Sequence, residues 1–340
     1  MAIEKFFVTG ATGFIGTHLV NELVRRGYSV RALSRSTSNR SGLPVDKIEI
    51  VQGDILDSDS LLKGMDGCSH VFHLAAYAKN WSPEPSVFYQ YNVVGMQNVL
   101  DAAAQIGIER VVLTSSIVTF GPTPPGVIGD ETLQRITQRY YTEYEETKAI
   151  AEKEALKRAS EGFPVVIVNP TRVYGPGKLT EGNSVTLMID QYDRGKLPVL
   201  LNHGVNVGNY VFVNDLVQGY ILAMERGRVG ERYILGGENV SLKEFYSLVD
   251  EVSGKKHFQI NLNPAFALAF GNLSKFAAKV FHIYPQITTG WVETFLVDWA
   301  YTSAKAEREL GYTITPLKEG IKRTYEWLCE IRAQGKAKKP

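Results

Sequence analysis

A glycine-rich turn near the N-terminus constrains the fold more than any other feature of the sequence. The short apolar run Phe6-Phe7-Val8 leads directly into Thr9-Gly10-Ala11-Thr12-Gly13-Phe14-Ile15-Gly16, and a helical pattern follows. Gly10 and Gly13 let the backbone turn tightly and approach a pyrophosphate, Gly16 permits close packing of helix on strand, and the helix N-terminus supplies N–H groups. The turn therefore predicts a dinucleotide site. Its expected cofactor-binding residues are Gly10, Thr12, Gly13, Phe14, Ile15 and Gly16.

Short β-rich runs alternate with helix-length spacers through the first half of the chain. The expected strands include 6–8, 30–33, 48–51, 70–73, 111–113 and 163–168. This alternation favours an α/β fold with a Rossmann-type, doubly wound parallel sheet. We expect an NAD(P)-binding domain over residues 1–169, with returns of the chain near 205–235. A smaller, mostly helical substrate-binding lobe (170–330) and a basic tail (331–340) would follow.

Composition narrows the classes of partner and compartment. A net charge of +1 over 340 residues gives no bulk attraction to nucleic acid. With only Cys68 and Cys329, no disulfide framework or cysteine-based zinc cage can form, and we predict no metal site. The N-terminal segment resembles a strand rather than a signal peptide, so we expect a cytoplasmic protein. The partner should be a small-molecule substrate.

The end of the second expected strand bears on the choice of cofactor. An NAD-binding site usually has an acidic residue there for the ribose 2′-hydroxyl, but this chain has Ser34 followed by Arg35. Arg35, helped by Arg40, could bind a 2′-phosphate. We expect NADP(H) to be preferred, and NAD(H) stays open because a missing carboxylate does not exclude it.

A tyrosine and a lysine four residues apart form the candidate acid/base pair. Tyr144 and Lys148 fall on one face of a predicted helix, where the lysine charge should lower the tyrosine pKa. The same spacing recurs at Tyr192/Lys196 and Tyr301/Lys305. Only Tyr144 follows a strand with a serine-rich end, so we select that pair. We also expect Tyr144 and Lys148 to contact the cofactor, with Lys148 on the nicotinamide ribose.

The hydroxyl that would hold a substrate oxygen comes from that strand end. Thr114-Ser115-Ser116 lies where open α/β sheets bind ligands, at the carboxyl ends of the strands. Hydroxyls there also serve to satisfy backbone groups, which is the simpler reading for Thr114 and Ser115. We predict Ser116 as the catalytic hydroxyl.

At these residues the chain resembles the extended short-chain dehydrogenase/reductase family. Further matching motifs are Gly53-Asp54, His73-Leu74-Ala75-Ala76 and Asn92-Val93-Val94-Gly95. Within the family it is most similar to the dihydroflavonol 4-reductase-like, 3β-hydroxysteroid dehydrogenase-like and hopanoid-associated epimerase members. The resemblance covers nearly the whole chain and is specific for the family but not for the substrate.

The resemblance implies further cofactor contacts. Asp54 and Ile55 would lie by the adenine, Ala75 and Ala76 along the cofactor, and Pro170 and Val173 near the nicotinamide. For Asn92 it implies a structural or proton-relay role, while a helix-capping amide is the alternative. We expect His73 to be a packed core histidine.

The residues after Ser116 disfavour one chemistry of the family. Nucleotide-sugar 4,6-dehydratases resemble this chain but carry an Asp-Glu pair at the position where it has Ile117 and Val118. Elimination is therefore not expected.

The C-terminal lobe contains an aromatic-rich amphipathic helix. Leu273, Phe276 and Val280 recur at helical spacing, and other aromatic residues lie nearby. These residues are Phe266, Phe270, Tyr284, Trp291, Phe295 and Trp299. They could form an aromatic wall for a large apolar substrate, with core packing as the alternative for each residue. The helix is not a transmembrane span, and peripheral membrane contact is a third interpretation.

Our leading hypothesis is an NAD(P)H-dependent reductase or dehydrogenase that interconverts an apolar ketone and a secondary alcohol. The alternatives are a nucleotide-sugar epimerase that uses bound NAD(P), and a noncatalytic NADP(H)-sensing protein. Family members often dimerise through two helices per subunit, so a homodimer through segments 87–105 and 140–160 is a further hypothesis.

Overall fold

The core of the protein is a parallel sheet of seven strands. The computed structural model describes residues 4–281, 284–285 and 287–337. The strands are arranged in the order β10-β6-β5-β4-β1-β2-β3, and every neighbouring pair is parallel. Their bounds are β1 (Lys5–Thr9), β2 (Ser29–Ser34), β3 (Glu49–Gln52), β4 (His70–His73), β5 (Arg110–Thr114), β6 (Val165–Pro170) and β10 (Arg232–Leu235). The predicted doubly wound fold is confirmed.

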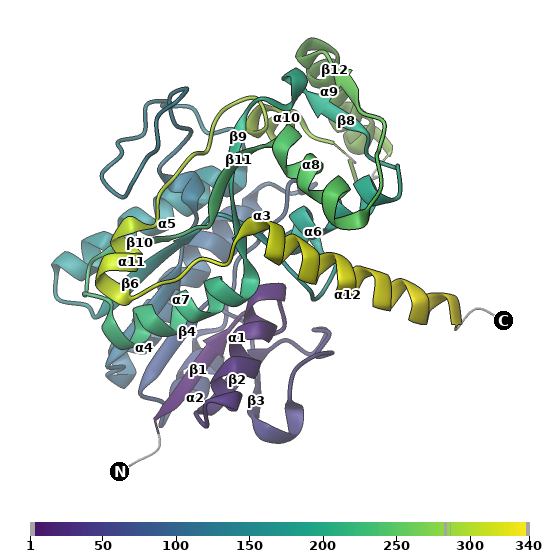
Figure 1. Ribbon diagram of the computed structural model, residues 1–340. Helices are drawn as coiled ribbons and strands as arrows, with labels where there is room; N and C mark the ends of the chain where they lie inside the picture. Colours follow the sequence, from purple (N-terminus) through teal and green to yellow (C-terminus); the bar gives the residue numbers. More distant parts are fainter. Residues whose placement is uncertain (1–3, 282–283, 286, 338–340) are drawn as a thin grey trace.

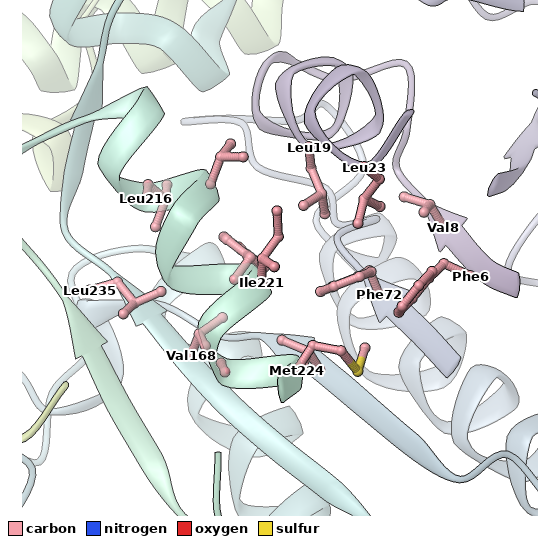
Figure 2. Close-up of a cluster of buried hydrophobic side chains, with 14 of the residues drawn as sticks. Phe6, Val8, Leu19, Leu23, Phe72, Val168, Leu216, Ile221, Met224 and Leu235 are labelled. Carbon is pink, nitrogen blue, oxygen red and sulfur yellow. The ribbon is translucent and has the colours of Figure 1, made fainter. Parts of the chain in front are cut away.

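Side chains alternate between two hydrophobic cores, one on each face of this sheet. Phe6 and Val8 of β1 pack toward one face, and Phe7 between them packs toward the other. The first face is covered by α1 (Phe14–Arg25), α7 (Val213–Arg226) and α11 (Ala304–Leu310). The second is covered by α2 (Ser58–Met65), α4 (Gly95–Ile106) and α5 (Glu143–Ser160). Figure 2 shows Leu19 and Leu23 of α1 near Phe6, Val8 and Phe72 in the first core, with Leu216, Ile221 and Met224 from α7.

The strand order reverses between β1 and β4. From β1 the chain runs outward through β2 to β3, and then crosses to β4 on the other side of β1. The loops after β1 and β4 therefore leave the sheet in opposite directions and open a crevice, which is where such folds bind ligands. The glycine turn lies at this point.

The C-terminal lobe combines short strands with helices. One small sheet has the order β11-β9-β7, and β12 pairs with β8. The strands are β7 (Arg172–Tyr174), β8 (Val199–Leu201), β9 (Val207–Phe212), β11 (Glu238–Ser241) and β12 (Ile260–Leu262). The helices are α6 (Ser184–Asp193), α8 (Leu242–Ser253), α9 (Pro264–Phe281), α10 (Thr289–Thr294) and α12 (Leu317–Ala337). Figure 1 shows α9 and β12 at the outer end of this lobe, at the top of the view and far from the N-terminus.

The chain crosses between the two parts of the molecule several times. Strand β10 adds an edge to the main sheet after the chain has formed β7 to β9. Isolated bridges then join Asp298 to Thr123 and Tyr301 to Gly129. Helix α12 continues through residues 331–337, part of the segment expected to form a basic tail, and residues 338–340 lie outside the described residues.

Several short helical turns complete the described structure. The short helix α3 (Ser86–Tyr89) runs into a π-helical turn, Gln90–Val94, and then into α4. The 3-10 turns are Val45–Lys47, Ile117–Thr119, Glu181–Asn183 and Asn202–Gly204. Within residues 4–281, 284–285 and 287–337, no helix combines the length and apolarity needed to span a bilayer.

Candidate active site

The glycine turn leaves no room for side chains where it touches its neighbours. Gly10 has a φ of +71°, and a Cβ there would lie 2.6 Å from the backbone N of Ala75. A Cβ at Gly16 would lie 2.1 Å from the carbonyl oxygen of Gly10. Helix α1 begins at Phe14 with no side-chain cap on Gly13, so the N–H groups of its first turn are left for a ligand. The turn fits a pyrophosphate.

A cleft of about 890 Å³ runs over the carboxyl ends of β1, β2, β3 and β4. Most of the predicted cofactor-binding residues line it: Gly10, Thr12, Gly13, Phe14, Ile15, Gly16, Arg35, Asp54, Ile55, Ala75 and Ala76. Four predicted residues do not: Tyr144, Lys148, Pro170 and Val173. Pro170 is buried at the end of β6, and Val173 packs against the first core from β7. The residues present therefore fit a dinucleotide along the glycine turn and the adjacent strand ends.

The end of β2 presents one arginine to the cleft. Arg35 lies on the cleft wall with Ser38, and its Cζ is 5.9 Å from the centre of the Tyr91 ring. Arg40, which we expected to assist, donates from Nε to Ser34 Oγ at 3.1 Å. The guanidinium of Arg40 thus supports the strand end.

The acidic residue on the same wall is held by its own loop. Asp54 Oδ1 accepts from the backbone N of Leu56 at 3.0 Å. Across the glycine turn, Lys178 Nζ donates to the carbonyl oxygens of Thr12 and Asn39, each at 2.8 Å. This lysine ties the turn to the loop that follows β2.

Helix α5 brings the predicted catalytic residues together at the end of β5. Thr142 caps the helix, and its Oγ1 accepts from the backbone N of Glu145 at 3.2 Å. One turn apart on the helix, the Tyr144 side chain lies near that of Ser116, and Lys148 Nζ donates to the carbonyl oxygen of Thr114 at 2.8 Å. The three predicted side chains therefore meet beyond one strand end.

Burial shifts the pKa values of this group. Burial raises the pKa of Tyr144, and the hydrogen bond with Ser116 opposes that shift only in part. Burial lowers the pKa of Lys148 to about 8, against the opposing charge of Glu152. We expected Lys148 to lower the pKa of Tyr144, but desolvation shifts each group toward its neutral form, raising the pKa of Tyr144 and lowering that of Lys148. Tyr144 is thus a neutral phenol near pH 7, with a proton to donate.

The other two hydroxyls of the strand end have separate surroundings. Thr114 Oγ1 accepts from the Tyr220 hydroxyl at 2.8 Å. Ser115 Oγ has no hydrogen-bond partner among the described residues, and Ser115 lines a cavity of about 10 Å³ with His73 and Lys148. That volume suits about one water molecule, which polar partners could hold.

A buried carboxylate supports the loop that carries Ser116. Glu152 follows Lys148 by one helical turn, and its Oε2 accepts from Asn169 Nδ2 at 2.6 Å and from Thr119 Oγ1 at 3.1 Å. Asn169 Nδ2 also donates to the carbonyl oxygen of Ser116 at 3.1 Å. Sequence reasoning missed Glu152 as a site residue, although its spacing places it on the same helix face as Tyr144 and Lys148.

Two other polar residues near the site are structural in this arrangement. His73 Nδ1 lies 2.7 Å from Thr9 Oγ1, and burial lowers the histidine pKa to about 3, so it is a neutral core residue. Asn92, in the π-helical turn, accepts from the backbone N of Tyr77 at 2.7 Å and donates to Thr147 Oγ1 at 3.0 Å. Asn92 therefore fixes Tyr77, which lines the cleft, against α5.

The two other Tyr/Lys pairs lie away from this site. Tyr192 is buried and stacks on Tyr246, with ring centroids 3.9 Å apart. Tyr301 is buried and donates to the carbonyl oxygen of Gly121, and Lys305 Nζ donates to Glu231. Both tyrosines serve packing.

The aromatic residues of the C-terminal lobe do not form one wall. Phe266 and Phe270 are exposed on the outside of α9, and Trp299 is buried in a core cluster with Tyr301. Trp291 and Phe295 pack against each other with centroids 4.6 Å apart.

One aromatic residue of that lobe reaches the mouth of the cleft. Glu181, which lines the cleft, accepts from the Tyr284 hydroxyl at 2.7 Å and from the backbone N of Asn80 at 3.0 Å. The Tyr284 ring meets Trp81 edge to face at 5.6 Å between centroids. Sequence reasoning missed Glu181 because its partners are remote along the chain and carry no shared pattern.

The fold and this site define a class. The sheet is parallel and doubly wound, and a turn that fits a pyrophosphate lies where its strand order reverses. A tyrosine and a serine lie next to each other beside this turn. These features place the protein among the NAD(P)-dependent enzymes of the extended short-chain dehydrogenase/reductase type. Residues 6–236 match the NAD dependent epimerase/dehydratase family, and the chain belongs to that family.

Similar proteins cover nearly the full chain. A protein of Synechocystis sp. named "Putative dihydroflavonol 4-reductase" is 33% identical over 95% of this chain and 94% of its own. The 4-hydroxy-2-methyl-3-oxo-4-farnesyl-3,4-dihydroquinoline-1-oxide ketoreductase of Stigmatella aurantiaca is 30% identical, over 91% of each chain. Among solved structures, the dTDP-glucose 4,6-dehydratase DesIV of Streptomyces venezuelae with NAD and TYD bound is 26% identical, with a TM-score of 0.78 over 97% of this chain and 98% of that chain.

Proposed function

We propose that the protein is an NADPH-dependent reductase of an apolar ketone, or the reverse alcohol dehydrogenase. The observation that carries the proposal is the placement of Ser116, Tyr144 and Lys148 together beyond the end of β5, beside the dinucleotide cleft. The similarity to a ketoreductase of a farnesylated substrate supports the substrate class.

In this proposal each residue of the group has one task. Ser116 donates a hydrogen bond to the carbonyl oxygen, and Tyr144, neutral near pH 7, gives that oxygen its proton. Lys148 holds a positive charge one helical turn away and binds the ribose next to the nicotinamide. The bound cofactor supplies the hydride.

Replacing Tyr144 by Phe tests the catalytic assignment. We expect Tyr144→Phe to reduce turnover by about two orders of magnitude or more, because the proton donor is lost, while NADPH affinity stays nearly unchanged. Tyr192→Phe, which alters a tyrosine with the same spacing to a lysine but outside the site, is the control and should retain its rate. An unchanged rate in Tyr144→Phe would show that Tyr144 is not the proton donor.

The preference for NADP(H) is also a proposal. Arg35 on the cleft wall and the absence of a carboxylate at the end of β2 support it. DesIV was solved with NAD, so NAD(H) remains the alternative cofactor. Fluorescence titration should show tighter binding of NADPH than of NADH, and Arg35→Ala should weaken only NADPH. Equal affinities in the unmodified protein would contradict the preference, and tighter binding of NADH would reverse it.

The substrate class can be tested by cofactor consumption. Depletion of NADPH against ketosteroid, flavonoid, β-keto acid and UDP-sugar panels should be steady with an apolar ketone. Ile117 and Val118 after Ser116 carry no proton-transferring group, which disfavours the dehydratase chemistry named for DesIV. Elimination of water from a nucleotide sugar would contradict this.

The second candidate is a nucleotide-sugar epimerase, which the family name favours. Such an enzyme would keep its cofactor bound and change the configuration of a sugar carbon with no net consumption of NAD(P)H. Altered sugar stereochemistry with tight cofactor retention would therefore select it. A noncatalytic NADP(H) sensor would show neither activity, but the meeting of Ser116, Tyr144 and Lys148 argues against it.

We further propose a homodimer and a cytoplasmic location. The dimer would use α4 and α5, which are neighbours on one face of the sheet; a monomer mass by light scattering across dilution would reject it. Cys68 and Cys329 are both free thiols, and this suits a reducing compartment.

A further inference from the structure

Helix α9 carries its large side chains outward and its small ones inward. Ala267, Gly271 and Ala278 are the buried residues of the helix. The exposed ones include Phe266, Phe270, Leu273, Phe276, Val280 and Phe281, and Phe266 and Phe276 are 71% and 65% exposed. We call these six residues the α9 apolar face. Such contiguous exposed apolar surface is rare on a protein without a partner.

The helix cannot rotate to bury this face. It packs closely on the segment at the start of α10, where a Cβ at Gly271 would lie 3.0 Å from the backbone N of Thr289. Asn272 Oδ1 also accepts from Thr289 Oγ1 at 2.9 Å. Small-residue packing therefore fixes the outward orientation of the phenylalanines.

Two further exposed apolar residues precede the helix in the chain. Phe258 is 79% exposed, and Ile260 at the start of β12 is also exposed. Figure 1 shows β12 and α9 at the outer end of the C-terminal lobe, and Ile260 is the first residue of β12.

The charges of this region are of one sign. Between Glu251 and Glu293 the sequence contains no Asp or Glu. Lys255 is paired with Asp193, but Lys256, Lys275 and Lys279 form no ion pair with any residue that the structure describes. An apolar face with unpaired lysines beside it complements an anionic lipid surface, where phenyl rings enter the interface and ammonium groups meet the headgroups.

A second copy of the chain fits this surface less well. Pairing through the α9 apolar face would bring one acid-free, lysine-bearing region against an identical one, so neither partner would supply the opposite charge. A bilayer with anionic lipid supplies both the apolar medium and the charge.

The surface lies next to the mouth of the cleft. Shortly after α9 ends, Tyr284 donates to Glu181, which lines the cleft. A bilayer under α9 would therefore lie close to the opening that a substrate must pass.

We propose that the α9 apolar face docks the protein on an anionic lipid bilayer, in the plane of the interface. The docking itself is independent of the proposed function. The corollary, that an apolar ketone reaches the cleft from the bilayer, rests on that function.

Vesicle binding tests the proposal on the full chain with NADPH. Sedimentation should carry the protein with vesicles of phosphatidylcholine mixed with phosphatidylglycerol, and high salt or phosphatidylcholine alone should weaken binding. The variant F266S/F270S/F276S should lose about tenfold or more in partitioning, since each exposed phenyl ring contributes apolar area. It should keep its melting temperature, because all three side chains are exposed.

Two further variants separate the causes. K275E/K279E should lose binding to the anionic vesicles while leaving the apolar face intact. Ile128→Ser with Ile136→Ser removes exposed apolar side chains of a loop outside α9 and should bind like the unmodified protein. These variants leave Ser116, Tyr144 and Lys148 untouched.

The outcomes distinguish the docking from the reaction. If the unmodified protein stays in the supernatant with both vesicle types, the docking proposal is wrong. If F266S/F270S/F276S then also lowers the mass measured by light scattering, the partner of the α9 apolar face is a second copy of the chain. Vesicle binding with no NADPH consumption on any ketone would keep the docking and reject the proposed reaction. Reduction of a water-soluble ketone by F266S/F270S/F276S at the unmodified rate would show that only docking was lost.

Discussion

The Lys148 ammonium is buried, and burial disfavours its charge. The free energy of unfolding should therefore depend on pH. Its pKa is about 8 in the folded protein, against about 10.4 for an ordinary lysine. Between these values the unfolded chain binds a proton that the folded chain has released, so the free energy of unfolding rises with pH. We expect this residue to contribute about 2 kcal/mol of added stability between pH 8 and pH 10.

Denaturant unfolding at those two pH values measures the effect. Lys148→Met cannot titrate, so its gain over the same pH interval should be smaller than that of the unmodified protein by about the same 2 kcal/mol. Identical pH dependence in the two proteins would mean that folding does not lower the pKa of Lys148.

Gly10 is the glycine whose replacement should be most informative. Its φ of +71° and that of Gly67, +69°, are alike, but a Cβ at Gly67 would meet nothing within 4 Å. Gly67→Ala should therefore cost only about 1 kcal/mol of backbone strain, whereas Gly10→Ala also pushes against Ala75. We expect Gly10→Ala to lose dinucleotide binding, measured by fluorescence titration, and Gly67→Ala to keep it. Equal binding by both would show that the turn tolerates a side chain.

At the scale of the element, α5 arranges three functional side chains on one face. Tyr144 and Lys148 face the end of β5, and Glu152 continues the row to the network of Asn169 and Arg232. Because the Glu152 charge raises the pKa of Lys148, Glu152→Gln should move the loss of the Lys148 proton to lower pH. The alkaline limb of the pH profile of kcat/KM should shift in that direction.

Glu146, exposed on the other side of α5, provides the control for that prediction. Glu146→Gln should leave the pH profile in place. A Glu152→Gln variant that loses activity equally at every pH would indicate that Glu152 only holds the loop.

Local patterns predicted those elements whose residues are close in sequence. The strand before Gly10, the capped helix with Tyr144 and the strand end at Ser116 each follow from periodicity or turn chemistry, and the structure contains them. The bond of Arg40 to Ser34 could not be predicted, because it depends on the path of a loop. The predicted direction of the Tyr144 pKa was wrong because burial, which the sequence does not display, raises that pKa.

Contacts that join the two parts of the molecule could not be predicted in the same way. Glu181 meets Asn80 and Tyr284 only after the whole chain has folded. The strands of the C-terminal lobe are short, and β8 and β12 have too few residues to show alternation. The exposed apolar face of α9 could not be distinguished from a buried one in the sequence. Helical periodicity shows that apolar residues share one face but not what that face contacts.

For the molecule as a whole, Tyr284 and Glu181 connect the outer lobe to the loop of Asn80 and Trp81 at the cleft. Tyr284→Phe removes the hydroxyl that donates to Glu181 and keeps the ring against Trp81. We expect a loss of about 1 kcal/mol in stability and a modest rise in the dissociation constant of the cofactor, with kcat largely retained. Tyr89→Phe, an exposed tyrosine outside the cleft, is the control, and calorimetric titration with NADPH measures both. A Tyr284→Phe protein that binds NADPH as the control does would separate this contact from cofactor retention.

The order of the strands also bears on how the chain folds as it leaves the ribosome. Strands β1 to β5 and the glycine turn lie within residues 5–114, so the nucleotide half is synthesised as one block. The sheet gains its last strand at Arg232–Leu235, and Asp298 and Tyr301 return to Thr123 and Gly129 later still. A nascent chain can therefore assemble the crevice for the dinucleotide before the lobe that encloses the substrate has been made.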